Sequence, residues 1–416
     1  MKNYNTIVIG GGPAGLAASK CASANGNKVL LIEREARLGG ILKQCIHDGF
    51  GVTRFKQKLT GPEYAQKEID ALMTTDVEVS LLTYVTKIVP SKGGYVLTLV
   101  SRSGVEDVFT NKLILSTGCR ERTSKQVAIH GTNPAGVITS GTAQYYINVL
   151  GKMPTQNCVI LGSGDIGLIM ARRITLEDGH VEGVYEVKST PSGLTRNIVQ
   201  CLNDYDIPLH LSHTVTRLFG VDRLEAVEVA QVNDVFTPIK GTERIIKCDA
   251  LILSVGLIPE NELASSLKIQ LNPKTKGPLC DQTMMTLKDN IYCCGNALHV
   301  NDLADYVSES GETAGNHAAQ TSESHMRRLC PVSFNSNFGY VIPSHIDLDG
   351  ELSNVIFYFR SSKDLFNQRL TITVDDIQVF SRAYSNLRPP EMERIIVNLA
   401  KNKNCSSIKL QLEDVG

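Results

Sequence analysis

The sequence lacks the features that indicate a membrane, nucleic-acid or secreted protein. Lysine and arginine (42 residues) balance aspartate and glutamate (43 residues), which gives a net charge of −1 and no electrostatic sign of a nucleic-acid or membrane partner. No apolar run approaches the ~20 residues that span a bilayer. The first apolar run begins at Thr6, so we expect no signal peptide before it.

The eleven cysteines form no recognisable framework, and the chain contains no CxxC motif. Adjacent Cys293 and Cys294 have poor geometry for a structural disulfide and match no zinc spacing; they are either a redox-active pair or buried strand residues. We therefore expect free thiols, a reducing cytoplasmic location and no metal site. The 416 residues, 42% hydrophobic and 20% charged, suit a globular protein of two or three domains.

Two glycine-rich turns follow apolar runs about 150 residues apart. Residues 10–15 read GGGPAG after the run 6–9, and residues 162–167 read GSGDIG after the run 158–161. In such a turn the first glycine allows the bend, the second lets the backbone approach a pyrophosphate, and the third lets the helix pack on the strand. The pyrophosphate then lies on the free N–H groups of the helix N-terminus.

Each glycine-rich turn is followed by a helix, a strand and an acidic residue. Glu33 lies 18 residues after Gly15, and Glu186 lies 19 residues after Gly167. A carboxylate at this position accepts hydrogen bonds from a ribose. The expected elements are helices at 16–22 and 168–177 and strands at 28–32 and 181–185. The repeated pattern predicts two dinucleotide sites, as in a protein that passes electrons between two cofactors.

We predict an α/β fold with two Rossmann-like dinucleotide-binding domains, one inserted in the other, and a small C-terminal β-rich domain. The first domain comprises residues 1–118 and 256–326, and the inserted domain comprises residues 119–255. Residues 327–416 form the C-terminal module, whose expected role is docking in a dimer or on a partner. Its expected strands lie at 355–359, 370–374, 377–380 and 408–412.

The motifs together resemble a known family. GGGPAG with Glu33, the Ser116-Thr117-Gly118 turn, the GSGDIG unit and Gly295-Asn296 are similar to the FAD- and NAD(P)-dependent pyridine nucleotide oxidoreductases related to thioredoxin and glutathione reductases. This resemblance covers residues 1 to about 326. Segments 38–51, 59–64 and 191–197 and the C-terminal module look closer to a branch of NAD(FAD)-dependent dehydrogenases. That branch resembles the polypeptide that accompanies glycerol-3-phosphate dehydrogenase-like flavoproteins and, more loosely, subunits of opine, sarcosine and hydrogen-cyanide-forming dehydrogenases.

The resemblance implies FAD and NAD as cofactors. The residues implied to bind FAD are Gly10, Gly12, Pro13, Ala14, Gly15, Glu33, Gly39, Gly40, Val85, Thr117, Gly118, Gly295, Asn296, Asp305 and Tyr306. Those implied to bind NAD are Gly162, Gly164, Asp165, Ile166, Gly167, Glu186 and Gly256. Asn296 stands where the family usually has aspartate, and the helix N-terminus near Asp305 would face the flavin N1/O2 edge. Glu186 would repel a 2′-phosphate and favour NAD over NADP, although Lys188 lies close to it.

One family feature is missing. Disulfide reductases carry a redox cysteine pair after the Gly-Gly turn or inside the NAD domain, whereas here the first place has only Cys45 and the second has no CxxC. We therefore expect hydride transfer between stacked rings in a dry pocket, which needs no protein nucleophile. Cys45 and His47 are the candidate catalytic residues, either as a thiol–imidazole pair that tunes the flavin or serves a proton, or as a packed cysteine and a loop histidine.

The leading hypothesis is an FAD-dependent NAD(H) oxidoreductase that passes two electrons between nicotinamide and flavin and on to a protein partner. That partner would be a glycerol-3-phosphate-dehydrogenase-type flavoprotein, with or without a small cysteine-containing carrier, in a homo- or hetero-oligomer. One alternative is a stand-alone NADH oxidase or disulfide reductase that uses Cys45. Another is a non-catalytic nucleotide-binding subunit of an opine- or sarcosine-type dehydrogenase complex.

Overall fold

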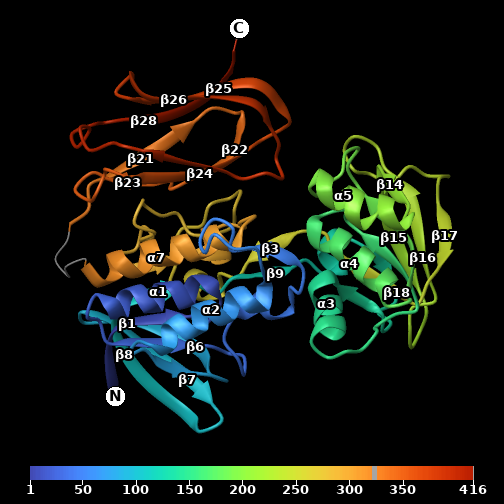
Figure 1. Ribbon diagram of the computed structural model, residues 1–416, viewed down its shortest axis with the longest axis horizontal. Coiled ribbons are helices and arrows are strands. Elements are labelled where there is room, and N and C mark those ends of the chain that lie inside the picture. The colour runs from blue at the N-terminus through green and yellow to red at the C-terminus, as the bar shows by residue number, and fades with distance from the viewer. Residues whose placement is uncertain (321–325, 416) are drawn as a thin grey trace. The chain divides into compact units, whose positions relative to one another are not determined.

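The chain forms two compact units in the computed structural model, which describes residues 1–320 and 326–415 (Figure 1). One unit comprises Met1–Cys119 and Pro259–Gly416, and the other comprises Arg120–Ile258. Where the chain passes from one unit to the other and back, β9 (Cys119–Glu121) pairs with β19 (Leu257–Pro259). The predicted α/β class, with one Rossmann-like part inserted in another, is confirmed.

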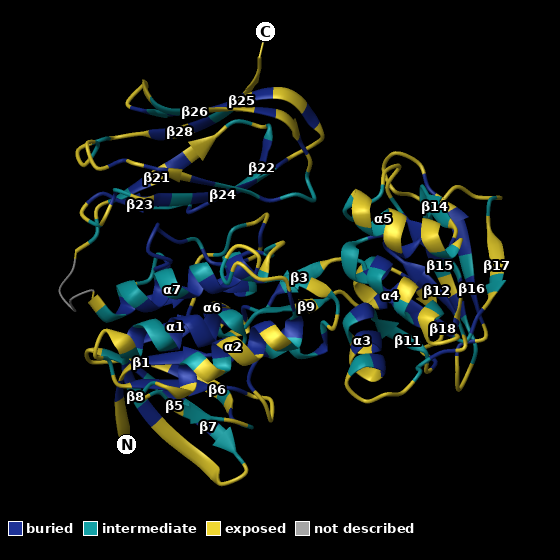
Figure 2. Cartoon of the chain, in the orientation of Figure 1, coloured by how far each residue is buried: buried dark blue, intermediate teal, exposed yellow. Residues whose placement is uncertain are grey.

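The first unit is built on a parallel sheet in the order β5-β2-β1-β8-β20. Its central strands are buried on both faces, as their near-continuous apolar sequences require (Figure 2). The first half of β8 extends beyond this sheet into an antiparallel meander with β7 and β6. The strands are β1 (Lys2–Ile9), β2 (Val29–Ile32), β5 (Glu78–Ser80), β6 (Tyr84–Ser91), β7 (Gly94–Ser101), β8 (Gly104–Leu115) and β20 (Ile291–Cys293).

Helices α1 (Pro13–Ala24), α2 (Gly61–Met73) and α7 (Ala304–Gln320) pack beside this sheet. Small residues bring α1 and α7 together, because a Cβ at Gly311 would lie 2.1 Å from the Ala14 carbonyl oxygen. The first turn of α2 is fixed by a capping box between Thr60 and Glu63. The remaining short elements are η1 (Gly40–Gln44), β3 (Asp48–Phe50), β4 (Leu59–Thr60), α6 (Glu262–Ser266) and η4 (Gly295–Ala297).

The second unit repeats the plan with a parallel sheet in the order β11-β18-β12-β13-β14. A second sheet, β10-β15-β16-β17, was not expected from the sequence. The first sheet and its helices are β11 (Val137–Thr139), α3 (Ser140–Asn148), β12 (Asn157–Leu161), α4 (Asp165–Leu176), β13 (His180–Glu186), α5 (Thr195–Cys201), β14 (Leu209–Leu211) and β18 (Ala250–Leu253). The added pieces are η2 (Ser124–Val127), β10 (His130–Gly131), η3 (Asn203–Tyr205), β15 (His213–Phe219), β16 (Ala226–Gln231) and β17 (Arg244–Lys247).

The C-terminal region is β-rich, as predicted, and encloses its own apolar core. One sheet has the order β23-β21-β28-β25-β26 and the other the order β22-β24-β27. The region is joined to α7 by polar contacts: the Tyr358 hydroxyl donates to Glu309 over 2.6 Å, and the Arg394 guanidinium donates to the same carboxylate over 2.6 and 2.8 Å. The strands are β21 (Leu329–Phe334), β22 (Phe338–Ile342), β23 (His345–Asp347), β24 (Val355–Ser361), β25 (Leu365–Val374), β26 (Ile377–Leu387), β27 (Glu393–Val397) and β28 (Ile408–Asp414).

No helix within the described part of the chain is long and apolar enough to cross a membrane.

Candidate dinucleotide-binding sites

The first glycine-rich turn joins β1 to α1. An added Cβ atom would have space at only one of its glycines. Gly10 has φ +108°, and a Cβ there would lie 2.3 Å from the Ser116 carbonyl oxygen. A Cβ at Gly15 would lie 1.8 Å from the Gly10 oxygen. At Gly12, however, the nearest atom to an added Cβ would be the Cα of Gly40, 3.9 Å away. The space beside Gly12 adjoins the N-terminus of α1, where free N–H groups favour an anion.

The second turn, between β12 and α4, has the same architecture. Gly162 has φ +97°, and its Cβ would lie 2.1 Å from the Ser254 oxygen. A Cβ at Gly167 would lie 2.7 Å from the Ser254 side chain, whereas at Gly164 the nearest atom would be 3.6 Å away. In both turns the outer glycines are enclosed by protein and the middle glycine is open. This is the arrangement a pyrophosphate needs to approach the backbone.

A buried glutamate is fixed beside each turn. Glu33 is 6% exposed and accepts the Gly11 N–H (2.7 Å) and the Glu35 N–H (2.8 Å) on different oxygens. Glu186 is 4% exposed and accepts the Ser163 N–H (3.0 Å) and the Lys188 N–H (3.1 Å), again on different oxygens. Each Glu33 oxygen has a second lone pair for a ribose hydroxyl, as does the Glu186 oxygen that faces Lys188. The carboxylates therefore fit the ribose-binding role.

Several residues predicted to bind FAD meet at the first turn, although they are far apart in the sequence. The Gly39 N–H donates to the Gly11 oxygen over 2.8 Å, which brings Gly40 against Gly12. A Cβ at Gly295 would lie 2.8 Å from the Cβ of Ala14. The segment leading to Val85 lies beside the ribose carboxylate, because the Thr83 N–H donates to the Glu33 carbonyl oxygen over 3.0 Å.

The side chains of Thr117 and Asn296 are engaged within the protein. The Thr117 hydroxyl donates to the Glu260 carbonyl oxygen over 2.6 Å. The Asn296 amide oxygen accepts the Asn301 N–H over 3.0 Å, and its nitrogen lies 3.6 Å from the Cys119 sulfur. Their predicted cofactor contacts would therefore involve the backbone or remaining lone pairs.

Asp305 places an unsatisfied carboxylate oxygen in the first unit. The residue is 6% exposed, and its Oδ2 accepts the Thr53 N–H over 2.9 Å. Its Oδ1 is buried and has no hydrogen-bond partner within the described residues. A buried oxygen of this kind fits a bound group that donates a hydrogen bond. The ring of Tyr306, by contrast, lies 6.0 Å from that of Tyr358 and so contacts the C-terminal region.

The carboxylate of Asp165 accepts hydrogen bonds from other groups of the protein. It accepts the Leu194 N–H over 2.9 Å and the Asn197 side-chain amide over 2.6 Å. Asp165 thereby fixes the segment before α5 against the second turn, and the Ser192 N–H adds a bond to Ser163 over 2.9 Å. The predicted contact between Asp165 and a pyrophosphate would involve its backbone N–H. Ile166 occupies the next position of α4, and Gly256 has φ +99° where the chain leaves the unit.

The candidate catalytic thiol is held protonated. Burial raises the pKa of Cys45 to about 12, and its sulfur lies 3.4 Å from the Ile41 carbonyl oxygen. The His47 ring packs 5.1 Å from that of Phe50. Since the thiolate is the nucleophilic form of cysteine, Cys45 is poorly suited to attack a disulfide at neutral pH.

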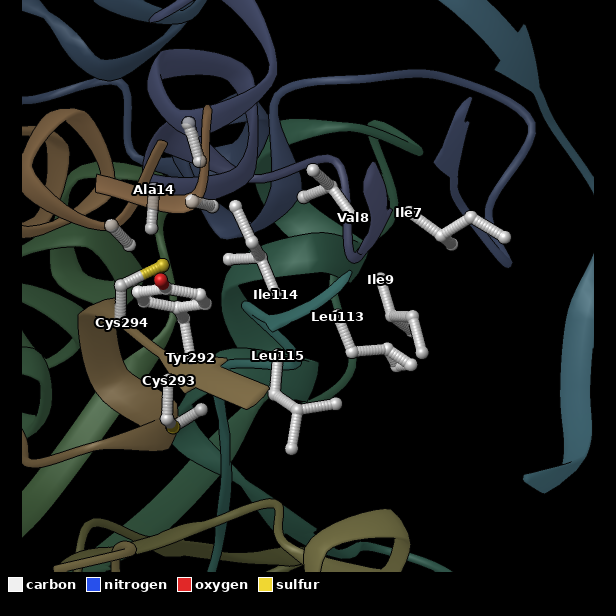
Figure 3. Close-up of a cluster of buried hydrophobic side chains, with 14 of the residues drawn as sticks. Ile7, Val8, Ile9, Ala14, Leu113, Ile114, Leu115, Tyr292, Cys293 and Cys294 are labelled. Atoms are coloured by element: carbon white, nitrogen blue, oxygen red, sulfur yellow. The ribbon is translucent and has the colours of Figure 1, made fainter. Parts of the chain in front are cut away.

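Cys293 and Cys294 lie in the apolar core of the first unit, beside Tyr292 and the ends of β1 and β8 (Figure 3). Both are fully buried, and burial raises the pKa of both thiols. They are packing residues rather than an accessible redox pair. Among the described residues, no cluster of three or more histidine, cysteine or acidic side chains could hold a metal ion.

An ion-pair network that the sequence did not reveal supports the first site. Arg54 binds Glu68 of α2 through its Nε and Glu312 of α7 over 2.6 Å, and Lys20 of α1 lies 3.5 Å from Glu68. The network links three helices and places Thr53 against Asp305. No local sequence pattern predicts this network, because Arg54 and Glu312 are 258 residues apart.

Comparison with known proteins identifies the family. Residues 4–320 match the family described as "Pyridine nucleotide-disulphide oxidoreductase". The chain belongs to this family. The cofactors of this family, FAD and NAD(P), are those predicted from the sequence, and they fit the two glycine-rich turns and their glutamates.

Relatives of the chain include one of the subunits of opine oxidase from Agrobacterium tumefaciens, which is 24% identical over 70% of this chain and 61% of that protein. Hydrogen cyanide synthase subunit HcnB of Pseudomonas protegens is 26% identical over 67% of this chain and 61% of that protein. Dihydrolipoyl dehydrogenase of Mycoplasma pneumoniae is 25% identical over 76% of this chain and 71% of that protein. The chain thus spans about three-fifths of the first two relatives. The fold is similar to that of T. acidophilum thioredoxin reductase (TM-score 0.61, 18% identity, 77% of this chain and 98% of that chain).

Proposed function

We propose that this oxidoreductase transfers a hydride between NAD(H) and FAD and exchanges the electrons with a separate protein. The observation that carries the proposal is the pair of glycine-rich turns, each open at its middle glycine and each flanked by a fixed, buried glutamate. A chain with two such turns is suited to two dinucleotides.

The residues have separable roles in this proposal. The turn at Gly12 and the N-terminus of α1 bind the FAD pyrophosphate, and Glu33 binds its ribose. The turn at Gly164 binds the pyrophosphate of NAD, and Glu186 repels the 2′-phosphate of NADP. FAD, when bound, supplies the acceptor for a hydride. Asp305 accepts a hydrogen bond from the cofactor with its unpartnered oxygen, which orients the cofactor without taking part in the transfer.

The electrons leave the protein for a partner rather than for an internal disulfide. The raised pKa of Cys45 and the burial of Cys293 and Cys294 support this, because none of the three thiols is suited to exchange. Relatives named as subunits of opine oxidase and hydrogen cyanide synthase support a multi-subunit assembly. On the resemblance of the sequence, the partner is a glycerol-3-phosphate-dehydrogenase-type flavoprotein in the cytoplasm, with or without a small cysteine-containing carrier. The β-rich region from about residue 327 is the proposed docking module.

Anaerobic reduction tests the proposal directly. The purified protein should be yellow, and NADH should bleach its flavin absorbance in the absence of oxygen. Because Glu186 carries the charge that rejects a 2′-phosphate, we expect kcat/KM for NADH to exceed that for NADPH by about tenfold or more, which corresponds to about 1.4 kcal/mol. A folded but colourless protein that NADH does not alter would contradict the proposal and favour a non-catalytic subunit.

Replacing Cys45 with serine separates the proposal from a thiol mechanism. We expect NADH-to-dye turnover to stay within about twofold of the wild type, because a thiol that is protonated at neutral pH contributes no nucleophile. The flavin content of the variant, measured alongside, shows whether the Gly-Gly loop still holds FAD. A loss of turnover at normal flavin content would support the stand-alone disulfide reductase instead.

A further inference from the structure

Two cysteines of the C-terminal region lie beside each other although they are 75 residues apart in the sequence. Cys330 lies on β21 and is buried in the apolar core of the region. Cys405 precedes β28, packs against the same core and is partly exposed. The two side chains are close enough for each to affect the pKa of the other. No role in the proposed hydride transfer is assigned to either residue.

The backbone holds the two cysteines at a spacing that suits a disulfide. Strands β21 and β28 are parallel, with Val332 opposite Ile408. Continued two residues towards the start of each strand, this register sets Cys330 beside Ser406, the neighbour of Cys405. Adjacent strands lie about 4.7–4.9 Å apart and successive residues rise about 3.3 Å along a strand, so the one-residue offset gives the two cysteines a Cα separation of roughly 6 Å. This is within the range of about 4.4–6.8 Å that disulfides adopt.

The segment that carries Cys405 is fixed on both sides. The carboxylate of Asp375 accepts the N–H groups of Ser406 and Ser407, each over 2.9 Å. On the other side Arg328 donates to the carbonyl oxygen of Lys403 over 2.7 Å. These contacts keep Cys405 beside Cys330, so formation of a bond between them needs little ordering of the chain.

We propose that Cys330 and Cys405 form a reversible disulfide when the protein meets a peroxide. The partly exposed Cys405, as thiolate, attacks the peroxide, breaks its O–O bond and becomes a sulfenic acid while hydroxide leaves and is protonated to water. The Cys330 sulfur then attacks the Cys405 sulfur, its proton goes to the departing hydroxide, and a second water is released. Two thiols are oxidised to one disulfide, and one hydrogen peroxide is reduced to two waters.

The reaction has a defined pH dependence. Burial raises the pKa of Cys330 to about 11 and also raises that of Cys405. The Asp375 carboxylate raises the pKa of both thiols, whereas Cys330 and Arg328 oppose the shift at Cys405. Because only the thiolate attacks, the rate of cross-linking should increase as the pH rises through the mildly alkaline range.

Peptide mapping of the full-length protein tests the proposal. Hydrogen peroxide should lower the thiol count of the denatured wild type from eleven to nine, and a thiol reductant should restore it. Without reduction, trypsin should release residues 329–360 joined to residues 404–409 with the loss of two hydrogen atoms. Because the cross-link closes a long loop, the oxidised protein should melt several degrees above the reduced one.

Two single substitutions serve as matched controls. Cys405→Ser should lose the joined peptides and the increase in melting temperature. Cys21→Ser removes a cysteine from α1 and should keep both. The proposal is overturned if the wild type retains eleven thiols after peroxide treatment at mildly alkaline pH, if another pair is joined, or if Cys405 is oxidised without a cross-link. The wild-type map decides the outcome even if a variant fails to fold.

Discussion

Gly12→Ala should give a folded protein that has lost most of its FAD. The backbone at Gly12 has φ −76°, which alanine adopts readily, and the added Cβ would meet no atom closer than 3.9 Å, so we expect little change in the free energy of unfolding. The methyl group would instead occupy the space in which a pyrophosphate contacts the N-terminus of α1. Loss of one or two charge-assisted hydrogen bonds corresponds to a decrease of about 10- to 100-fold in FAD affinity. Flavin content after gel filtration and a urea unfolding curve are the two measurements.

Gly164→Ala is the matched counterpart in the second unit. Its backbone is also permissive (φ −65°), and its Cβ would lie 3.6 Å from the nearest atom. This variant should remain yellow, while its KM for NADH increases by about tenfold or more. The two variants therefore control for each other, because each should affect one cofactor and spare the other. Full flavin content in Gly12→Ala, or loss of flavin in Gly164→Ala, would contradict the assignment of the two turns.

Features of the site that depend on neighbouring residues could be predicted from the sequence. The turn at Gly10, the acid at Glu33 and their repeat in the second unit each lie within a segment of about 25 residues, and the structure forms them as helices and strands close to those predicted. The main local differences are the starts of the two helices. Helix α1 begins at Pro13 rather than Leu16, because proline suits the first helical position, and α4 begins at Asp165 rather than Leu168.

Features that depend on distant segments could not be predicted. The contact of Thr53 with Asp305 joins positions 252 residues apart, and no periodicity in the sequence relates them. The carboxylate of Asp165 accepts the N–H of Leu194, which is 29 residues further along the chain, and the sequence does not show which donor a given carboxylate will accept. Local sequence patterns thus predict the two glycine-rich turns and their glutamates, whereas the contacts around them depend on tertiary packing.

One missed element did carry a local signal. Strand β7 alternates buried Tyr95, Leu97 and Leu99, which are 7%, 0% and 2% exposed, with residues that are less buried. This period of two is typical of a half-buried strand. The meander that β7 forms with β6 and β8 could therefore have been predicted, but the pairing of β8 with both β7 and β20 depends on the tertiary fold.

Arg327→Met should produce the largest loss of stability among single substitutions at ion pairs in the first unit. The Arg327 side chain is 4% exposed and binds the fully buried carboxylate of Asp281 over 2.9 Å. Methionine would keep the apolar stem but leave the Asp281 charge without its cation, and removal of one partner of a buried pair costs about 3–5 kcal/mol. The midpoint of urea unfolding should decrease accordingly, while flavin content in the folded protein stays normal because the pair is not among the residues at the first glycine-rich turn.

The neighbouring residue provides the control for this prediction. Arg328 is 51% exposed and pairs with Asp349 over 3.0 Å, so water screens the interaction. Arg328→Met should cost less than about 1 kcal/mol. The two variants differ by one position along the chain and carry the same change of residue. Arg327 pairs with the buried Asp281 and the exposed Asp289, whereas the carboxylate that pairs with Arg328 is exposed. Equal losses of stability in both would show that Asp281 is stabilised by the N–H of Thr283, which it accepts over 2.9 Å, rather than by the guanidinium.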